Sequence, residues 1–341
     1  MTEKDLYEQM KKFPKVDLHR HLEGSILPET FIDITRTYGG TLPADEVEAL
    51  RPLIQMVHDQ PGFHSFLNKF KVFRCFYPCR EAIEEIAYRA VREAAEDAVK
   101  YLELRYSPTH FACSNRFSEQ DVVLWIQRAI DRSSKDFGII VTPIATISRD
   151  YGVVLAEQTM NMISRLAPGY FYGLDLAGDE INNAAQPFSR VFTMAENSGL
   201  KLSIHAGEAG GEANIYEAVE QFHAERIGHG IRAADDEALM EMLGRRNILL
   251  EICLTSNLQT GVVADIKHHP IKRLMAFGVP VSLNTDDPAI SGITLTDEYI
   301  KAVQELNFTV EDLKKLNSDA LNHAFYPDKD WLKKKLGCLW D

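Results

Sequence analysis

The chain of 341 residues lacks any stretch that approaches the ~18 apolar residues needed to cross a bilayer. Its first residues, MTEKDLYEQMKKFPK, are charged and lack the apolar core of a signal peptide. Cysteine is also scarce, and the five cysteines are scattered and odd in number, which is not typical of a disulfide framework. These absences predict a cytoplasmic protein without a membrane partner.

Positive charge is in short supply, with 37 Lys and Arg against 50 Asp and Glu and a formal net charge of −13. Binding to a phosphate backbone requires clustered Lys and Arg side chains. We therefore expect no nucleic-acid partner and no preference for an anionic membrane surface. The composition leaves the oligomeric state open.

Linkers rich in Ser, Gly or Pro are absent, and no short-period repeat appears. The content of 45% hydrophobic and 26% charged residues is ordinary for a globular protein with a large core. We therefore predict a single domain that spans residues 1–341.

Eight short apolar runs alternate with segments whose apolar residues recur every three or four positions. The runs are 15–19, 101–106, 139–147, 170–176, 200–205, 226–229, 248–253 and 279–284. This alternation predicts an α/β fold, a parallel sheet closed as a (β/α)8 barrel, the TIM barrel. An open doubly wound sheet is the alternative, but it usually has a Gly-rich turn where this chain has HRHLEG.

The connection after the first strand, about residues 29–76, is long for a barrel of this kind. Phe63, Phe66, Leu67 and Phe70 have helical spacing within it. We expect a helical insertion that covers the mouth of the barrel.

Histidines and carboxylates follow several of the predicted strands, at the end of the barrel where active sites form. They are His19 and His21 after the first run, His205 and Glu208 after the fifth, His229 after the sixth, and Asp286 and Asp287 after the eighth. Residues two apart on a strand share a face, so both early histidines can point inward while Arg20 points away. Three imidazoles and one carboxylate form a ligand set suited to zinc or a similar divalent ion.

Each of these residues also has an ordinary structural interpretation. His205 alone would be a hydrogen-bonded core histidine, and DDP would be a turn. The carboxylates of DLAGDE, from Asp175 to Glu180, would be solvated loop residues. The site is favoured because all of these segments fall at the same end of one predicted barrel.

Taken together, the motifs resemble those of the adenosine deaminase family. They are KVDLHRHLEG, LELRYSP, GLDLAGDE, IHAGE, RIGHG, EICLTSN and SLNTDDP, in the order of the family and over nearly the whole chain. The resemblance implies a hydrolase that converts adenosine and 2'-deoxyadenosine to inosine and 2'-deoxyinosine with release of ammonia. It also implies one divalent metal ion, with Zn2+ as the first candidate.

The resemblance assigns a role to each matching residue. The metal ligands would be His19, His21, His205 and Asp286. Glu208 would donate a proton to purine N1, and His229 would orient the attacking hydroxide. Contacts to the substrate would come from His21, Glu23, Gly178 at N3 and Asp287 at N7.

Two positions bear on the substrate. Glu23 stands where adenosine-specific members usually carry Asp for the ribose, which keeps a modified adenosine such as aminodeoxyfutalosine open as an alternative. Gly228 stands where adenine deaminases typically carry Asp, which favours a nucleoside. A non-catalytic nucleoside-binding protein, an AMP deaminase and an unrelated metallohydrolase are further alternatives, less favoured because the full motif set is present without a basic cluster.

Overall fold

The computed structural model describes residues 2–73, 76–112, 116–167 and 169–340. Eight parallel strands pair in chain order. They are β1 (Lys15–His21), β2 (Val99–Tyr106), β3 (Ile140–Ser148), β4 (Gly173–Ala177), β5 (Lys201–Ala206), β6 (Arg226–His229), β7 (Leu249–Ile252) and β8 (Val281–Leu283). A parallel bridge between Arg20 and Asp286 joins the loop after β8 to β1, so the predicted (β/α)8 barrel is confirmed.

The strands differ from the predicted runs only at their ends. β1 continues to His21 because the His21 backbone N–H donates to the Asp286 carbonyl at 2.9 Å. The polar residues at this end interrupt the apolar pattern, yet Arg20 and His21 still pair with β2. The pairing with β2 shifts register between Asp17 and Arg20, an irregularity that is common beside active sites.

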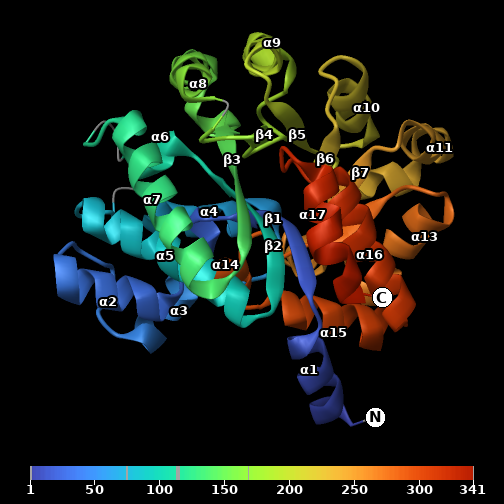
Figure 1. Ribbon diagram of the computed structural model, residues 1–341, viewed down its shortest axis with the longest axis horizontal. Coiled ribbons are helices and arrows are strands. Elements are labelled where there is room, and N and C mark those ends of the chain that lie inside the picture. Colours follow the sequence, from blue (N-terminus) through green and yellow to red (C-terminus); the bar gives the residue numbers. More distant parts are fainter. Residues whose placement is uncertain (1, 74–75, 113–115, 168, 341) are drawn as a thin grey trace.

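Helices surround the strands on the outside of the barrel (Figure 1). The main barrel helices are α5 (Arg80–Glu96), α7 (Glu119–Phe137), α8 (Val153–Leu166), α9 (Ser189–Asn197), α10 (Glu212–Glu220), α11 (Glu237–Arg246), α13 (Ile271–Ala276), α15 (Leu295–Leu306) and α16 (Val310–His323). Short helices α6 (Pro108–Phe111), α12 (Leu254–Gln259) and α14 (Pro288–Ser291) follow strands, while α1 (Glu3–Lys12) and α17 (Lys329–Leu336) lie near the termini.

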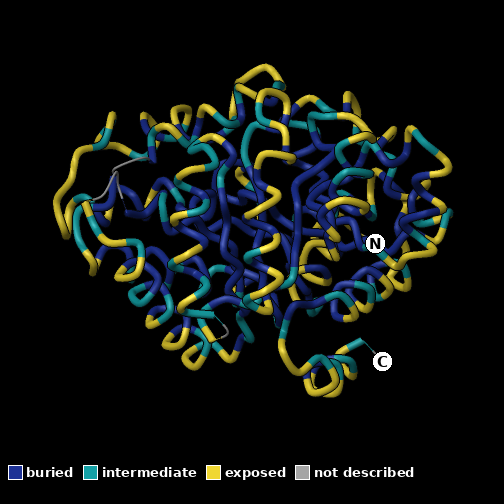
Figure 2. The backbone as a smooth tube through the Cα atoms, turned by 90° about the horizontal axis from the view of Figure 1, so that it is seen from above, coloured by how far each residue is buried: buried dark blue, intermediate teal, exposed yellow. Residues whose placement is uncertain are grey.

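The helices turn an apolar face to the strands. In α5, for example, Ile83, Ile86, Ala90 and Val91 are all buried at the spacing of one helical face. The tube in Figure 2 is accordingly buried at its centre and exposed along its outer edge. The hydrophobic core therefore holds the eight strand ends in fixed positions.

The connection after β1 folds as a helical insertion, as predicted, with α2 (Pro28–Tyr38), α3 (Val47–Ile54) and α4 (Phe63–Phe73). Residues 74–75 of the predicted segment lie outside the described part of the chain. The backbone N–H of Met56 donates to the Ile290 carbonyl, and that of Gly62 donates to the Gln259 carbonyl, both at 2.9 Å. These bonds fix the insertion to the segments that follow β7 and β8.

In the described residues, no helix has both the length and the apolar character needed to cross a membrane. Cys79, Cys253 and Cys338 have free thiols. Cys75 and Cys113 lie outside the described residues.

Candidate functional site

The carboxyl ends of the strands surround a cavity that is open on one side. The predicted site residues His21, Glu23, Gly178, His205, Glu208, His229, Asp286 and Asp287 all line it. The apolar side of α4 forms one wall through Phe63, Phe66, Leu67 and Phe70, which is the face predicted for the insertion. Arg20 instead pairs with Asp17, with 3.0 Å between Nε and Oδ2, and does not line the cavity.

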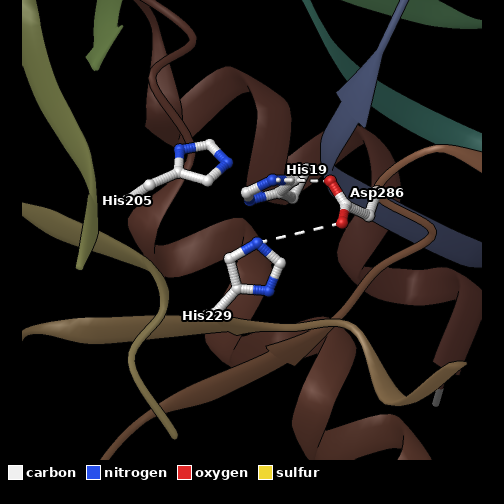
Figure 3. Close-up of side chains that lie close together, drawn as sticks. All are labelled: His19, His205, His229 and Asp286. Atoms are coloured by element: carbon white, nitrogen blue, oxygen red, sulfur yellow. Dashed lines mark ion pairs between the residues drawn. The ribbon is translucent and has the colours of Figure 1, made fainter. Parts of the chain in front are cut away.

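A compact, buried group is formed by His19, His205, His229 and Asp286 (Figure 3). His19 Nε2 lies 3.2 Å and His21 Nε2 lies 3.5 Å from Asp286 Oδ1. His21 Nε2 is also 3.4 Å from His205 Nε2. His229 Nε2 lies 3.8 Å from the other carboxylate oxygen of Asp286.

Buried carboxylates orient two of these imidazoles. His19 Nδ1 lies 2.7 Å from Glu251 Oε2, and His205 Nδ1 lies 2.9 Å from Asp175 Oδ1. Because a carboxylate accepts, each Nδ1 carries a proton, and in the neutral ring that a ligand requires, Nε2 then presents a lone pair to the group. Asp175, which could have been a solvated loop residue, is fully buried beneath the site.

One arginine connects these two carboxylates. Arg105 Nη2 lies 2.8 Å from Glu251 Oε2, and its Nη1 lies 3.3 Å from Asp175 Oδ2. Arg226 pairs with the opposite oxygen of Glu251, with 2.6 Å between Nε and Oε1. All four side chains are fully buried, so they form an ionic layer below the histidines.

The chemistry of this group fits a divalent cation. His19 Nε2 is buried and has no hydrogen bond of normal geometry among the described residues, although it points at Asp286. Burial lowers the pKa of His21, which keeps its imidazole neutral, as a ligand must be. The nearby histidines hold the pKa of Asp286 well below its usual range against the effect of burial, so its carboxylate stays ionised.

The pKa of Asp287, the next residue along the chain, is shifted in the opposite direction to that of Asp286. Burial, followed by the charge of Asp286, raises the pKa of Asp287 well above its usual range. The Asp287 carboxyl packs against the backbone of Gly24, where a Cβ atom would lie only 1.8 Å from its Oδ1. Adjacent carboxyls with separated pKa values are typical of sites that assign them different tasks.

A third carboxyl, Glu208, faces the same group. Burial, followed by the charges of Asp286 and Glu180, raises the pKa of Glu208 well above its usual range. Its Oε2 lies 3.7 Å from His229 Nε2. Glu180 accepts the backbone N–H groups of Gly207, at 3.1 Å, and Gly210, so it holds the loop that carries Glu208.

Backbone conformation also marks the site. His229 and Asp286 have positive φ angles of 58° and 62°, which is uncommon for residues other than glycine. Gly228 faces the group, and a Cβ atom there would lie 3.1 Å from atoms of both His19 and His205. A side chain at position 228 would therefore press on both imidazoles.

Glu23 lies above the end of β2, in the short 3-10 turn Glu23–Ser25. Its Oε1 accepts the Ser107 backbone N–H at 2.7 Å, while Oε2 is buried and has no partner among the described residues. Burial raises the pKa of this carboxyl to about 7. The Thr146 hydroxyl, also in the cavity wall, is likewise buried without a described partner.

A family model described as "Adenosine deaminase" matches residues 14–336.

The chain belongs to the adenosine deaminase family.

Individual members of the family and its structural neighbours carry different substrate names. An adenosine deaminase of Serratia proteamaculans is 38% identical over 319 residues, covering 94% of this chain and 96% of that protein. The crystal structure of an adenine deaminase from Arthrobacter aurescens superposes with a TM-score of 0.87 at 28% identity, covering 95% of this chain and 98% of that one. The Arabidopsis N6-mAMP deaminase superposes with a TM-score of 0.85 at 25% identity, covering 98% and 99%.

The sequence did not predict the residues that hydrogen-bond to the site histidines or to the partners of those histidines. These are Arg105, Glu251, Asn257 and His269. The first three lie inside LELRYSP and EICLTSN, so their signal was a charged or amide residue within an apolar run. His269 follows a polar segment, and nothing local connects it with the site.

Proposed function

We propose that this protein hydrolyses the 6-amino group of adenosine and 2'-deoxyadenosine and releases ammonia. The observation that carries the proposal is the pair of buried carboxyls, Glu208 and Asp287, that line the same cavity as His21, His205 and His229. Burial and the charge of Asp286 raise the pKa of both carboxyls, which favours the protonated form of each. Purine N1 and N7 are acceptors, and a protonated carboxyl is a donor for each.

We propose further that His19, His21, His205 and Asp286 hold one divalent cation, zinc. When bound, such a cation lowers the pKa of water from ~15.7 towards ~7 and so supplies hydroxide near neutral pH. The two oriented Nε2 lone pairs and the ionised Asp286 are the donor set that supports this choice.

The remaining steps are assigned to side chains of the chain. Glu208 donates its proton to N1, which makes C6 electrophilic, while the Asp287 carboxyl holds N7. The Gly178 backbone N–H meets N3, and its positive φ of 98° brings the backbone close to the cavity. His229 holds the attacking oxygen in line with C6. Positioning of this kind supplies much of the rate in such reactions.

The charges around the cavity support a nucleoside rather than a nucleotide. Of the described residues that line it, none is Lys or Arg, whereas Glu23 and Asp150 add carboxylates beyond the purine site. A phosphate group would lack the cationic partners it needs. A modified adenosine is the second candidate, because Glu23 is longer by one methylene than the Asp usual in adenosine-specific members.

The substrate is tested by ammonia release from adenosine, 2'-deoxyadenosine, adenine, AMP and aminodeoxyfutalosine at equal concentration, with metal content measured on the same sample. We expect adenosine and 2'-deoxyadenosine to react fastest. Turnover of the modified nucleoside alone would replace the substrate, and fast release from AMP would contradict the charge argument. No release from any of the five with metal present would refute the proposed function.

A further inference from the structure

A chain of buried hydrogen bonds runs from the backbone to His229. The Ile271 backbone N–H donates to His269 Nδ1 at 3.2 Å. His269 Nε2 lies 3.2 Å from Asn257 Oδ1, and Asn257 Nδ2 lies 3.2 Å from His229 Nδ1. All three side chains are buried.

The direction of every bond in this chain follows from its first member. A backbone N–H can only donate, so His269 Nδ1 must accept and the His269 proton must sit on Nε2. Burial holds the pKa of His269 at about 3, so the ring carries only that one proton near neutral pH. His269 Nε2–H therefore donates to Asn257 Oδ1, which turns the amide Nδ2–H towards His229.

We propose that Asn257, oriented by His269, is a positioning residue that fixes the proton of His229 on Nε2. His229 Nδ1 accepts from the Asn257 amide, so Nε2–H is the atom that faces the cavity. This is the reverse of His19 and His205, whose Nδ1 atoms face carboxylates, so that in a neutral ring the proton is on Nδ1 and Nε2 is free of it.

The position of the ring proton distinguishes His229, a hydrogen-bond donor, from His19 and His205, which can bind a cation. Ligand atoms of His19, His205, His229 and Asp286 all fall within 4.8 Å of one another, so distance alone would admit His229 as a metal ligand. A ring nitrogen that carries a proton cannot ligate a cation, but it can donate to an oxygen. His229 Nε2 faces both Glu208 Oε2 and Asp286 Oδ2, at 3.7 Å and 3.8 Å.

The catalytic consequence rests on the proposed function, in which His229 donates to the attacking oxygen. The tautomer itself does not depend on that function. Reversal of the tautomer of a catalytic histidine costs about 10⁴-fold in kcat in serine proteases, where an Asp partner is replaced by Asn. Here the natural partner of the histidine is the amide of Asn257, so the substitution that tests the tautomer replaces Asn by Asp.

The test is Asn257→Asp in the metal-loaded protein, which keeps the shape but offers only acceptors. His269 still donates to one oxygen, and the other oxygen draws the His229 proton to Nδ1. Histidine labelled with ¹⁵N is read by NMR, and the His229 signals are assigned as those missing from His229→Gln. We expect Nε2–H in the wild type, Nδ1–H in Asn257→Asp, and a fall in kcat of about 10²- to 10⁴-fold with a smaller change in KM.

Asn317→Asp is the matched control, because Asn317 is also a buried amide but bonds to Val16, Leu313 and Tyr299 away from the site. It should lower stability and leave the His229 signals and kcat unchanged. His269→Gln retains an amide donor towards Asn257 and should keep most of kcat.

An Nδ1–H tautomer in the wild type would overturn the inference, and this measurement decides even if Asn257→Asp fails to fold. An unchanged tautomer and kcat in Asn257→Asp would also overturn it. If the metal-loaded wild type has the Nε2–H tautomer but releases no ammonia from any nucleoside, the proposed function fails while the role of Asn257 stands.

Discussion

Replacement of Arg105 gives the sharpest test of how the barrel core supports the site. Its guanidinium is fully buried and pairs with Glu251 and Asp175, which in turn hold His19 and His205. It also donates to the Leu18 carbonyl at 2.7 Å. A single cation thus sets the orientation of two imidazoles that come from opposite parts of the sheet.

The size of each effect depends on which buried carboxylates the Arg105 variant leaves without a cationic partner. Arg105→Met leaves two buried carboxylates without their shared cation, and removal of one partner of a buried ion pair costs about 3–5 kcal/mol. Set against a typical total stability of about 5–15 kcal/mol, this would leave the domain marginal. Arg105→Lys keeps the charge, but one ammonium cannot span both carboxylates, so one imidazole loses its fixed orientation.

Metal affinity is the assay, because loss of residues that orient ligands typically costs 10- to 100-fold in affinity. We expect Arg105→Lys to bind zinc at least tenfold more weakly in competition with a chelator. Arg226→Lys is the control, since Arg226 is equally buried but pairs with the far oxygen of Glu251 and with Glu103. If Arg105→Lys lowers the melting temperature as Arg226→Lys does, with zinc affinity unchanged, the orienting role of Arg105 is refuted.

Three further predictions follow from individual contacts. Gly24→Ala should displace the Asp287 carboxyl and lower kcat/KM by about 10²-fold with metal content unchanged; wild-type kinetics would contradict this packing. In wild type, the folded pKa of His269 is about 3 while the unfolded value is near 6.5, so the unfolded chain binds the extra proton between these pH values. Stability is then complete above pH 6.5 and falls on acidification, by about 2 kcal/mol at pH 5, and urea titration should show a flatter pH profile in His269→Gln. A chelator should abolish ammonia release and lower the melting temperature, since a ligand at about 1,000 times its Kd stabilises by ~4 kcal/mol; an unchanged melting temperature would argue against a bound ion.

Local patterns predicted the barrel well because each strand is a buried apolar run and each outer helix has one apolar face. The ends of β1 and β4 were less predictable, since hydrogen bonds to neighbouring strands determine them. His21 belongs to β1 through its bond to Asp286, a residue 265 positions later in the chain. No window around residue 21 contains that information.

The candidate site was predicted where a motif carries the chemistry itself, as in HRHLEG, HAGE and NTDDP. Residues that act through another residue were not, because their partners come together only in the fold. Asp175 and Glu180 looked like loop carboxylates, yet one holds His205 and the other holds the loop of Glu208. The single domain over residues 1–341 and the cytoplasmic location stay predictions.

The central claim is that Glu208 is the proton donor in hydrolysis of a purine nucleoside. The most direct test compares wild type with Glu208→Gln, measuring ammonia release from adenosine together with metal content. We expect the variant to keep about one metal ion per chain and to lose at least 10²-fold in kcat, because the amide cannot give up a proton. Near-wild-type turnover with metal in place would contradict the account.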